Sequence, residues 1–487
     1  MIAEWIDEAA AERGDASYLE DAAGTGSLTF AGLRRVTAGW ARCLDRAGVA
    51  PGAAVALRLP DPLGYATALV GIIGAGRVVV PLDPAAPGTE LSRMLAVARP
   101  QAMVCEPPVD DLPVDLTVLR PAEVLAEDAV LAEDARSSWP ESGGGIFLCT
   151  SGTTGTPKGI LLRDDQLGHV AAAVVSHHRL SPADRGYCCL PLFHINAEVV
   201  GLLATLAARA CLVVDRKFSR RGFWPLIEGK RITWINAVPA IITVLAMDPF
   251  EAERPGGRVR FIRSASAPLA PAALERFEQA FGIPVVETYG MTEAASMITA
   301  NPLDGPRKAG SVGLPAGAEV RVVPVAGAAD AVGRVQIRGR GVITEYAAGG
   351  PAGAIDPEGW LDTGDLGRLD SGGYLFLVGR SDDVINRGGE KIYPREIEDF
   401  LLAQEGVSSA AVVAAHDEVL GGRPVAFVVP TGSWSADKLE YALHEACEEG
   451  LPRARRPSAF FVVEEMPLGR TGKISRRRLR ELAATPG

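Results

Sequence analysis

The chain alternates short apolar, β-branched runs with longer segments in which apolar residues recur at helical spacing, through the first three quarters of its 487 residues. The strand candidates read AAVALRLP, RVVVPLD, QAMVCEP, RACLVVD and FGIPVVETYG, and the helix candidates include GYATALVGIIGAG and PAALERFEQAF. Strands that alternate with helices pair in parallel, because each crossover helix returns the chain to the same edge of the sheet. We therefore predict an α/β fold in which helices cover βα-layered, parallel sheets.

The pattern changes near Glu319 to short strands and turns, which read EVRVVPV, GRVQIRG and GYLFLVG. These runs predict a β-rich subdomain before residue 380. Beyond it, about a hundred residues alternate helix and strand again, which is enough for a small α+β domain of its own. We predict a large N-terminal domain over residues 1–380 and a small C-terminal domain over residues 381–487.

Charge and cysteine content exclude several classes of function. The 60 acidic and 49 basic residues give a net charge of -11, which disfavours a dedicated nucleic-acid binder or attraction to an anionic membrane. The seven cysteines form no C-x-x-C pair, so we expect reduced thiols in a cytoplasmic protein and no zinc site. The N-terminal segment lacks the pattern of a signal peptide, and no apolar run reaches the roughly 18 residues of a membrane span.

The most specific local signal is the segment TSGTTGTPKG at 150–159, directly after the apolar strand candidate IFLC. Its glycines free the backbone to turn N–H groups toward an anion, its hydroxyls add donors and Lys158 adds a positive charge. It is not a Walker A loop, because Pro157 and Gly159 flank the lysine. A flexible surface loop is the alternative. The candidate polyphosphate-binding residues are Thr150, Ser151, Gly152, Thr153, Thr154, Gly155 and Lys158.

This segment resembles the phosphate-binding motif of the adenylate-forming superfamily, which groups acyl-CoA synthetases, nonribosomal peptide adenylation domains and luciferases. Five further segments resemble the other motifs of that superfamily, in the same order. They are PLFH at 191–194, YGMTE at 289–293, LDTGD at 361–365, GRSDD at 379–383 followed by RGGEKI at 387–392, and LGRTGK at 468–473. The resemblance covers nearly the whole chain and implies a large N-terminal domain with a small, mobile C-terminal domain.

The resemblance also implies a role for individual residues. For catalysis it implies Lys473, His194, Thr292 and Glu293, with Glu293 also holding the metal. For ATP and AMP it adds Ala267, Glu287, Tyr289, Gly290, Met291, Asp365 and Arg380 to the phosphate-binding residues. For coenzyme A it implies Gly388 and Gly389, and for the hinge between domains Asp382. For the acyl pocket it implies His194, Ile195, Asn196, Trp234, Ala265 and Ser266.

An ATP-dependent acyl-CoA ligase is the function that this resemblance implies. The enzyme would join a small carboxylic acid to ATP as an acyl adenylate, and domain alternation would then allow coenzyme A to form the thioester. Because a carboxylate and ATP are both anions, catalysis should rest on positioning and charge neutralisation, supplied by Lys158, Lys473 and a Mg²⁺ ion at Glu293. The polar Asn196 suggests a defined, partly polar acid. A carrier protein as the thiol acceptor and a homodimer as the assembly are left open.

Two departures from the superfamily pattern keep alternatives open. Many acyl-CoA synthetases have two glycines before Ala-Pro-Leu, whereas this chain reads SASAPL at 264–269. After the phosphate loop many members have a Ser/Thr-His pair, whereas this chain reads Leu-Arg-Asp at 162–164. One alternative is an enzyme that retains a single half-reaction. Another is a free-standing amino-acid adenylation domain, in which Glu198 would hold the amine. The neighbouring His177 and His178 are interpreted as a coincidence at the surface.

Overall fold

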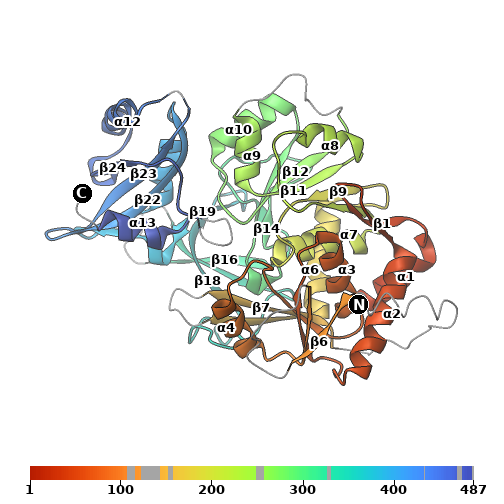
Figure 1. Ribbon diagram of the computed structural model, residues 1–487. Helices are drawn as coiled ribbons and strands as arrows, with labels where there is room; N and C mark the ends of the chain where they lie inside the picture. Colours follow the sequence, from red (N-terminus) through yellow and green to blue (C-terminus); the bar gives the residue numbers. More distant parts are fainter. Residues whose placement is uncertain are drawn as a thin grey trace.

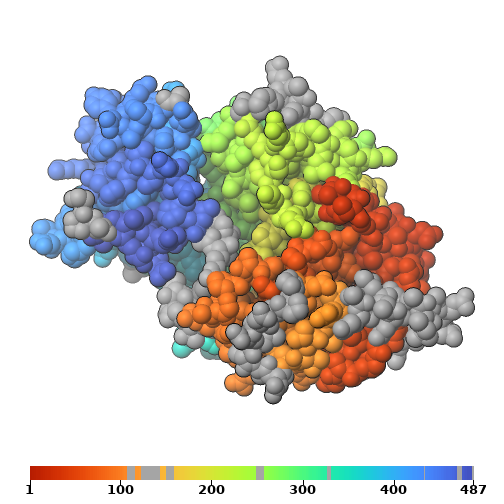
Figure 2. Space-filling model, viewed as in Figure 1, coloured from red at the N-terminus to blue at the C-terminus, as the bar shows by residue number. Residues whose placement is uncertain are grey.

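The computed structural model describes residues 1–106, 116–121, 143–151, 157–247, 257–325, 331–432, 434–468 and 474–484. Within these residues the strands form four sheets. Figure 1 shows the C-terminal segment, coloured blue, as a separate body beside the larger part of the chain, and Figure 2 shows the same division on the surface. The predicted α/β fold, with a large N-terminal domain and a smaller C-terminal domain, is confirmed.

The largest sheet has nine described strands in the order β15-β14-β13-β12-β11-β9-β10-β1-β2. In that order the strands are Leu314–Pro315, Thr299–Ala300, Val285–Tyr289, Phe261–Ser264, Trp234–Ala237, Arg185–Cys188, Cys211–Val214, Ser17–Asp21 and Ser27–Thr29. The strands from β13 to β1 run parallel, as the βα alternation predicts. The helices around this sheet are α6 (Asp164–His178), the π-helix η1 (Asn196–Leu203), α7 (Ala204–Ala207), α8 (Phe223–Gly229), α9 (Pro239–Ala246) and α10 (Pro271–Phe281).

A second sheet has six described strands in the order β6-β5-β3-β4-β7-β8. In that order they are Thr117–Leu119, Ala102–Cys105, Ala54–Arg58, Val78–Pro81, Gly145–Ser151 and Pro157–Arg163. Its helices are α1 (Ile2–Arg13), α2 (Phe30–Arg46), α3 (Pro62–Gly74) and α4 (Gly88–Ala98). The strands run parallel except β8, which returns antiparallel to β7.

Helix α3 lies between these two sheets. Asp61 caps its first turn, since the Asp61 carboxylate accepts a hydrogen bond of 2.7 Å from the Gly64 N–H. Almost every residue from Tyr65 to the end of the helix is buried, and α3 contacts β1 of the large sheet and β3 and β4 of the second sheet. A helix that is apolar on all sides requires such cover on all sides. Within the described residues, no helix is long and apolar enough to cross a membrane.

The β-rich subdomain and the C-terminal domain follow in turn. An antiparallel four-stranded sheet comprises β16 (Glu319–Pro324), β17 (Gly333–Arg338), β18 (Leu361–Leu369) and β19 (Leu375–Arg380). The C-terminal sheet comprises β20 (Ile385–Arg387), β21 (Glu390–Ile392), β22 (Val407–Asp417), β23 (Gly421–Pro430) and β24 (Phe460–Val462). Its helices are α11 (Pro394–Leu402), α12 (Ala436–Gly450) and α13 (Arg476–Ala483). The C-terminal sheet and its helices enclose their own hydrophobic core.

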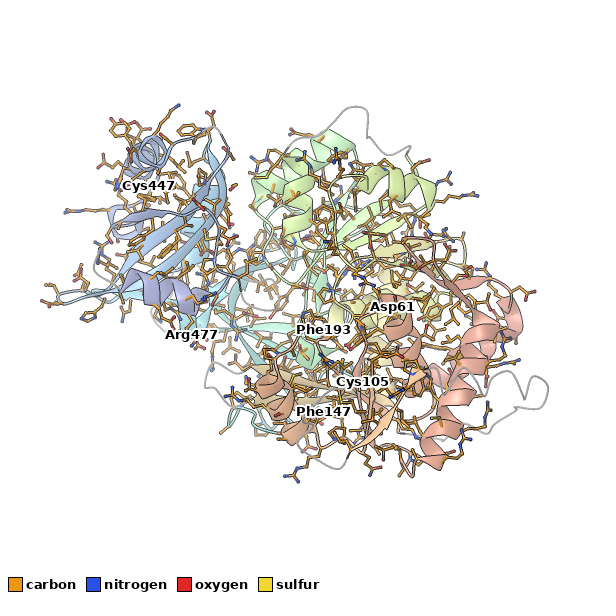
Figure 3. All side chains as sticks on the ribbon, in the orientation of Figure 1. Asp61, Cys105, Phe147, Phe193, Cys447 and Arg477 are labelled. Atoms are coloured by element: carbon orange, nitrogen blue, oxygen red, sulfur yellow. The ribbon has the colours of Figure 1, made fainter. Side chains whose placement is uncertain are left out.

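The parallel strands bring two of the sequence motifs, PLFH and YGMTE, and the segment SASAPL to one edge of the large sheet. The segments that follow β9, β12 and β13 leave this edge at residues 189–195, 265–270 and 290–295. The carboxyl edge of a parallel sheet is where α/β proteins bind ligands, because its loops converge there. Figure 3 labels Phe193, from the first of these segments, near the middle of the large domain, whereas Cys447 and Arg477 lie in the C-terminal domain.

Candidate active site

The glycine-rich segment connects two antiparallel strands of the second sheet. β7 ends at Ser151 and β8 begins at Pro157, and the register pairs Thr150 with Lys158. Thr150 and Ser151 are described by their backbone alone, at the end of β7. The other predicted phosphate-binding residues of the segment, Gly152, Thr153, Thr154 and Gly155, lie outside the described residues.

Lys158 lies beside two residues from distant parts of the chain. Its Nζ atom is 5.6 Å from the ring centroid of Tyr346, and the Tyr346 hydroxyl donates a hydrogen bond of 3.1 Å to Oε1 of Glu293. The Glu293 carboxylate is nearly buried and stands in the short 3-10 helix η3 (Thr292–Ala294). The structure therefore brings together a predicted phosphate-binding lysine and the predicted metal-binding carboxylate.

Only glycine fits at position 290, where the chain turns from β13 toward η3. A Cβ atom at this position would lie 1.2 Å from the backbone oxygen of Ser296. Because that oxygen belongs to the backbone, no side-chain rotation relieves the clash. Gly290 thus fixes the turn that carries Met291 and Thr292 away from Tyr289 and leads into Glu293.

Tyr289, Asp365 and Arg380 form a hydrogen-bonded group between the large sheet and the β-rich subdomain. The Tyr289 hydroxyl donates to Oδ2 of Asp365, and Nη1 of Arg380 donates 3.2 Å hydrogen bonds to Oδ1 of Asp365 and to the Thr363 carbonyl oxygen. Arg380 ends β19, two residues before the predicted hinge residue Asp382. The group therefore links the predicted nucleotide-binding residues to the segment that enters the C-terminal domain.

Glu287 is a buried acid at the same edge. It is 2% exposed, and its Oε1 atom accepts a hydrogen bond of 3.5 Å from the Leu269 N–H. Burial raises the pKa of Glu287 to about 7, and the positive charge of Arg395 on α11 opposes the rise. The C-terminal domain thus influences the charge of a residue in the large sheet.

Glu287→Gln is expected to remove a pH-dependent loss of stability. A carboxyl whose pKa rises on folding stabilises the protein fully below its unfolded pKa, and this contribution is lost as pH rises through the folded pKa. A rise from 4.5 to about 7 corresponds to about 3 kcal/mol, since one pKa unit is about 1.4 kcal/mol. Urea unfolding at pH 5 and pH 8 should therefore show a smaller decline for Glu287→Gln than for the unchanged protein. The exposed Glu275→Gln on α10 should leave the decline unchanged; an equal decline in all three proteins would contradict the assignment.

The predicted acyl-pocket residues other than Trp234 lie next to this edge. His194 contacts Phe193 edge to face, with ring centroids 4.6 Å apart, and Ile195 and Asn196 lead from there into the π-helix η1. Nδ2 of Asn196 donates a hydrogen bond of 3.3 Å to Oγ of Ser266. Ala265 is buried, and Ala267, the predicted nucleotide contact, is exposed beside Ser266. The structure thus places the acyl-pocket candidates beside a predicted nucleotide-binding residue.

Ser266 occupies a backbone conformation that favours glycine. Its φ angle is +74°, in the left-handed region that costs a residue with a side chain on the order of 1 kcal/mol. This explains in physical terms why many acyl-CoA synthetases have glycine in this segment. Here the hydroxyl accepts from Asn196, which offsets part of the strain. The departure in the sequence therefore adds a polar contact to the acyl pocket.

Ser266→Gly is expected to leave stability unchanged or raise it by up to about 1 kcal/mol, because the strain is relieved while the unfolded chain gains freedom. The value of kcat/KM for the acid should fall several-fold, since Asn196 loses its acceptor. Urea unfolding and acyl-CoA formation measure the two effects. The neighbouring Ala267→Gly, at an ordinary φ angle, should instead destabilise. If Ser266→Gly lost as much stability as Ala267→Gly, the backbone of Ser266 would not be strained.

One sequence-based interpretation is wrong, and two further candidates are buried. Trp234, predicted to line the acyl pocket, is fully buried and stacks on Phe261 with ring centroids 6.0 Å apart. It begins β11, whereas the other acyl-pocket candidates follow the carboxyl ends of strands. His178 is fully buried, not at the surface, and its Nδ1 atom lies 2.9 Å from Nδ1 of His177. Glu198, considered as an amine ligand, is fully buried in η1, and burial raises its pKa.

The other departure, at residues 162–164, leaves the local structure intact. Helix α6 begins at Asp164, and the Gln166 side chain accepts a hydrogen bond of 3.0 Å from the Arg163 N–H. A glutamine in the first turn of a helix that satisfies the N-terminal backbone is a normal helix start. Helix α6 therefore begins normally without the Ser/Thr-His pair, because Gln166 satisfies the backbone N–H of Arg163 at its start.

Gly388, Gly389 and Asp382 are the C-terminal candidates that the structure describes. Gly388 and Gly389 form the exposed turn of the β20–β21 hairpin, with φ angles of +59° and +92°. The Gly388 N–H donates to the Leu420 carbonyl oxygen at 2.8 Å, within the same domain. Asp382 is exposed in η4 (Ser381–Asp383). Lys473 lies outside the described residues.

Two residues of the acyl region were missed from the sequence. Arg263 and Asn236 are buried on β12 and β11, and both bond to Asn196. The available signal was an arginine within the apolar run VRFIRS. A charged residue in the middle of a central parallel strand is unusual, because both faces of such a strand are buried.

The fold and site define a two-domain nucleotide-binding protein whose ligand groups meet at the carboxyl edge of a parallel sheet. Residues 6–347 match the model of the AMP-binding enzyme family, and residues 396–473 match that of the AMP-binding enzyme C-terminal domain. The chain belongs to the AMP-binding enzyme family, and within it to the adenylate-forming enzymes of the acyl-CoA synthetase type.

Named relatives and solved structures agree with this class. The chain is 37% identical to sulfoacetate–CoA ligase from Cupriavidus necator, over 96% of this chain and 95% of the relative. It is 34% identical to oxalate–CoA ligase from Arabidopsis thaliana, over 90% of this chain and 89% of the relative. The structure of ATP-bound MatB from Rhodopseudomonas palustris matches with a TM-score of 0.88 at 28% identity and covers 99% of each chain.

Proposed function

We propose that this chain activates a short, polar carboxylic acid with ATP and transfers the acyl group to coenzyme A. The observation that carries the proposal is that the candidate nucleotide-binding residues, among them Asp365 and Glu293, lie near the polar side chains around Asn196. Relatives named for sulfoacetate and for oxalate support a short acid. Free coenzyme A, not a carrier protein, is the proposed acceptor.

In the first step a carboxylate oxygen of the acid attacks the α-phosphorus of ATP. The bond from that phosphorus to the bridging oxygen breaks, and pyrophosphate leaves. Because both reactants are anions, the protein contributes position and positive charge. We assign the charge to Lys158 and Lys473. Asp365 would accept hydrogen bonds from both ribose hydroxyls, which its two carboxylate oxygens permit.

Glu293 fits a Mg²⁺ ion that is shared with the phosphates. Mg²⁺ in such sites takes one or two carboxylates and completes its shell with phosphate oxygens and water. Among the described residues, no group of three or more His, Cys, Asp or Glu side chains is arranged to hold a metal by itself. Bound there, the ion would neutralise phosphate charge. Tyr346 donates to one Glu293 oxygen and thereby orients the carboxylate.

In the second step the sulfur of coenzyme A attacks the acyl carbon, the bond to the AMP oxygen breaks, AMP leaves and the thiol proton passes to solvent. We assign the thiol channel to the turn at Gly388 and Gly389. In the present arrangement a Cβ atom on Gly389 would meet no described atom within 4 Å, so this turn faces open space. Rotation of the C-terminal domain about Asp382 would carry it to the acyl adenylate.

The experiment is mass spectrometry of reactions that contain a panel of acids, ATP and Mg²⁺, with and without coenzyme A, and a parallel set supplied with acyl adenylates. Acyl-CoA from a free acid is the expected result. Acyl-CoA from supplied adenylates alone would show that the first half-reaction is lost. Acyl-AMP that never becomes acyl-CoA would indicate adenylation alone and would contradict the proposal.

A further inference from the structure

Arg263 is a buried cation below the acyl region. It stands on β12, between β13 and β11 of the large sheet, and is 1% exposed. Ser266 follows three residues later in the chain, after the buried Ala265, and is exposed. A charged side chain at this depth requires compensation, because transfer of an ion from water to the interior costs several kcal/mol.

The hydrogen bonds of Arg263 reach amide oxygens. Nη1 donates to Oδ1 of Asn196 at 2.7 Å and to Oδ1 of Asn236 at 3.2 Å. Nδ2 of Asn236 also lies 3.4 Å from Oδ1 of Asn196. We call Arg263, Asn196 and Asn236 the polar floor. Since a guanidinium only donates, Oδ1 of Asn196 must face Arg263, and Nδ2 of Asn196 must face Ser266.

No carboxylate compensates the charge of Arg263 among the residues that the structure describes. Burial lowers the pKa of Arg263 to about 9, and the interaction that opposes this comes from the Cys188 thiol. The nearby His177 and His178 add no negative charge, and Arg263 helps to lower the pKa of both imidazoles after burial itself. The Nε atom of Arg263 is buried without a hydrogen-bond partner among the described residues. The polar floor is therefore positive and incomplete.

We propose that the polar floor selects acids that carry a second anionic group, with Arg263 as the positioning residue and Asn196 as the contact. The inference rests on the proposed ligase function. The second anion would accept from Nδ2 of Asn196 and from the Ser266 hydroxyl. Arg263 orients the amide and supplies the positive potential behind it, which acts strongly in a low-dielectric interior.

The geometry also limits the acid to a short one. Ser266 adjoins Ala267, the predicted nucleotide contact, so the group bound at the polar floor and the carboxylate that reacts with ATP must be close together. A long apolar chain would have to pass Asn196 and displace its hydrogen bonds to Arg263 and Ser266. Leaving these buried polar groups without partners would cost more than an apolar chain gains there.

The test uses matched pairs of acids with the unchanged protein. Each pair keeps the size and replaces the second anion by a neutral group: oxalate with oxamate, malonate with its monomethyl ester, and sulfoacetate with methylsulfonylacetate. Initial rates of acyl-CoA formation give kcat/KM for each acid. We expect the anionic member of at least one pair to be favoured by about tenfold or more, as for a hydrogen bond to a charged group. If both members of every pair react equally well, or if the neutral members react faster, the inference is wrong while the proposed ligase function stands. Formation of no acyl-CoA from any acid would overturn the proposed function as well.

Two variants assign the preference to the polar floor. Asn196→Asp should fold, because the new carboxylate pairs with Arg263, and it should abolish the ratio between anionic and neutral acids, whatever the total activity. Arg263→Gln should lower the ratio between anionic and neutral acids by about tenfold. Arg260→Gln is the control, since that arginine flanks the same strand and pairs with Asp184 at 2.9 Å. A structural role alone would change total activity and leave the ratio intact; an unchanged ratio in Asn196→Asp would overturn the inference.

Discussion

Lys473→Ala should lower the rate of acyl-adenylate formation by about 1000-fold, while thioester formation from a supplied acyl adenylate stays within about threefold. The first step brings two anions together, and removal of one positioned charge at such a site costs on the order of 100- to 1000-fold or more. The second step involves an uncharged acyl carbon and does not need that lysine. Acid-dependent exchange of pyrophosphate into ATP measures the first step, and acyl-CoA release measures the second.

The matched control is Lys438→Ala in the same domain. Lys438 lies in the first turn of α12, and its Nζ atom lies 4.4 Å from the ring centroid of Trp434. Its loss removes an exposed lysine without touching the proposed site, so both rates should stay near those of the unchanged protein. Equal loss of both half-reactions in Lys473→Ala would contradict the division of labour between the two faces of the C-terminal domain.

The fold could be predicted because the hydrophobic pattern within each segment already indicates a helix or a strand. Apolar runs alternate with helical periodicity, and parallel pairing follows from that order. Asp61 before an apolar helix shows the same locality, since its carboxylate caps the first turn.

The acyl region could be predicted only in part, because its contacts depend on which end of a strand a residue occupies. Trp234 and Asn236 are two residues apart on β11, yet one packs in the core against Phe261 and the other bonds to Asn196 near the carboxyl edge. Arg263 reaches Asn196 across 67 positions of the chain. No local pattern encodes that contact, because it depends on the packing of η1 against β11 and β12.

Gly389→Trp should have the reciprocal effect to Lys473→Ala. We expect acyl-adenylate formation within about threefold of the unchanged protein and thioester formation lowered by about 100-fold, since an indole in a narrow channel excludes the thiol. The substitution should be tolerated by the fold in the present arrangement, because the Cβ position of Gly389 meets no described atom within 4 Å. The same two assays separate the steps, and accumulation of acyl-AMP should accompany the loss of acyl-CoA.

Two controls separate the channel from local strain and from bulk. Gly389→Ala carries the strain of a side chain at a φ angle of +92° with little added volume, so it should retain most thioester formation. Gly432→Trp places the same indole in an open position of the same domain and should leave both rates unchanged. If Gly389→Ala were as inactive as Gly389→Trp, backbone strain would explain the loss. If Gly389→Trp formed thioester normally, the hairpin turn would not line the thiol channel. Together with the opposite behaviour expected of Lys473→Ala, selective loss in Gly389→Trp would require two arrangements of the C-terminal domain.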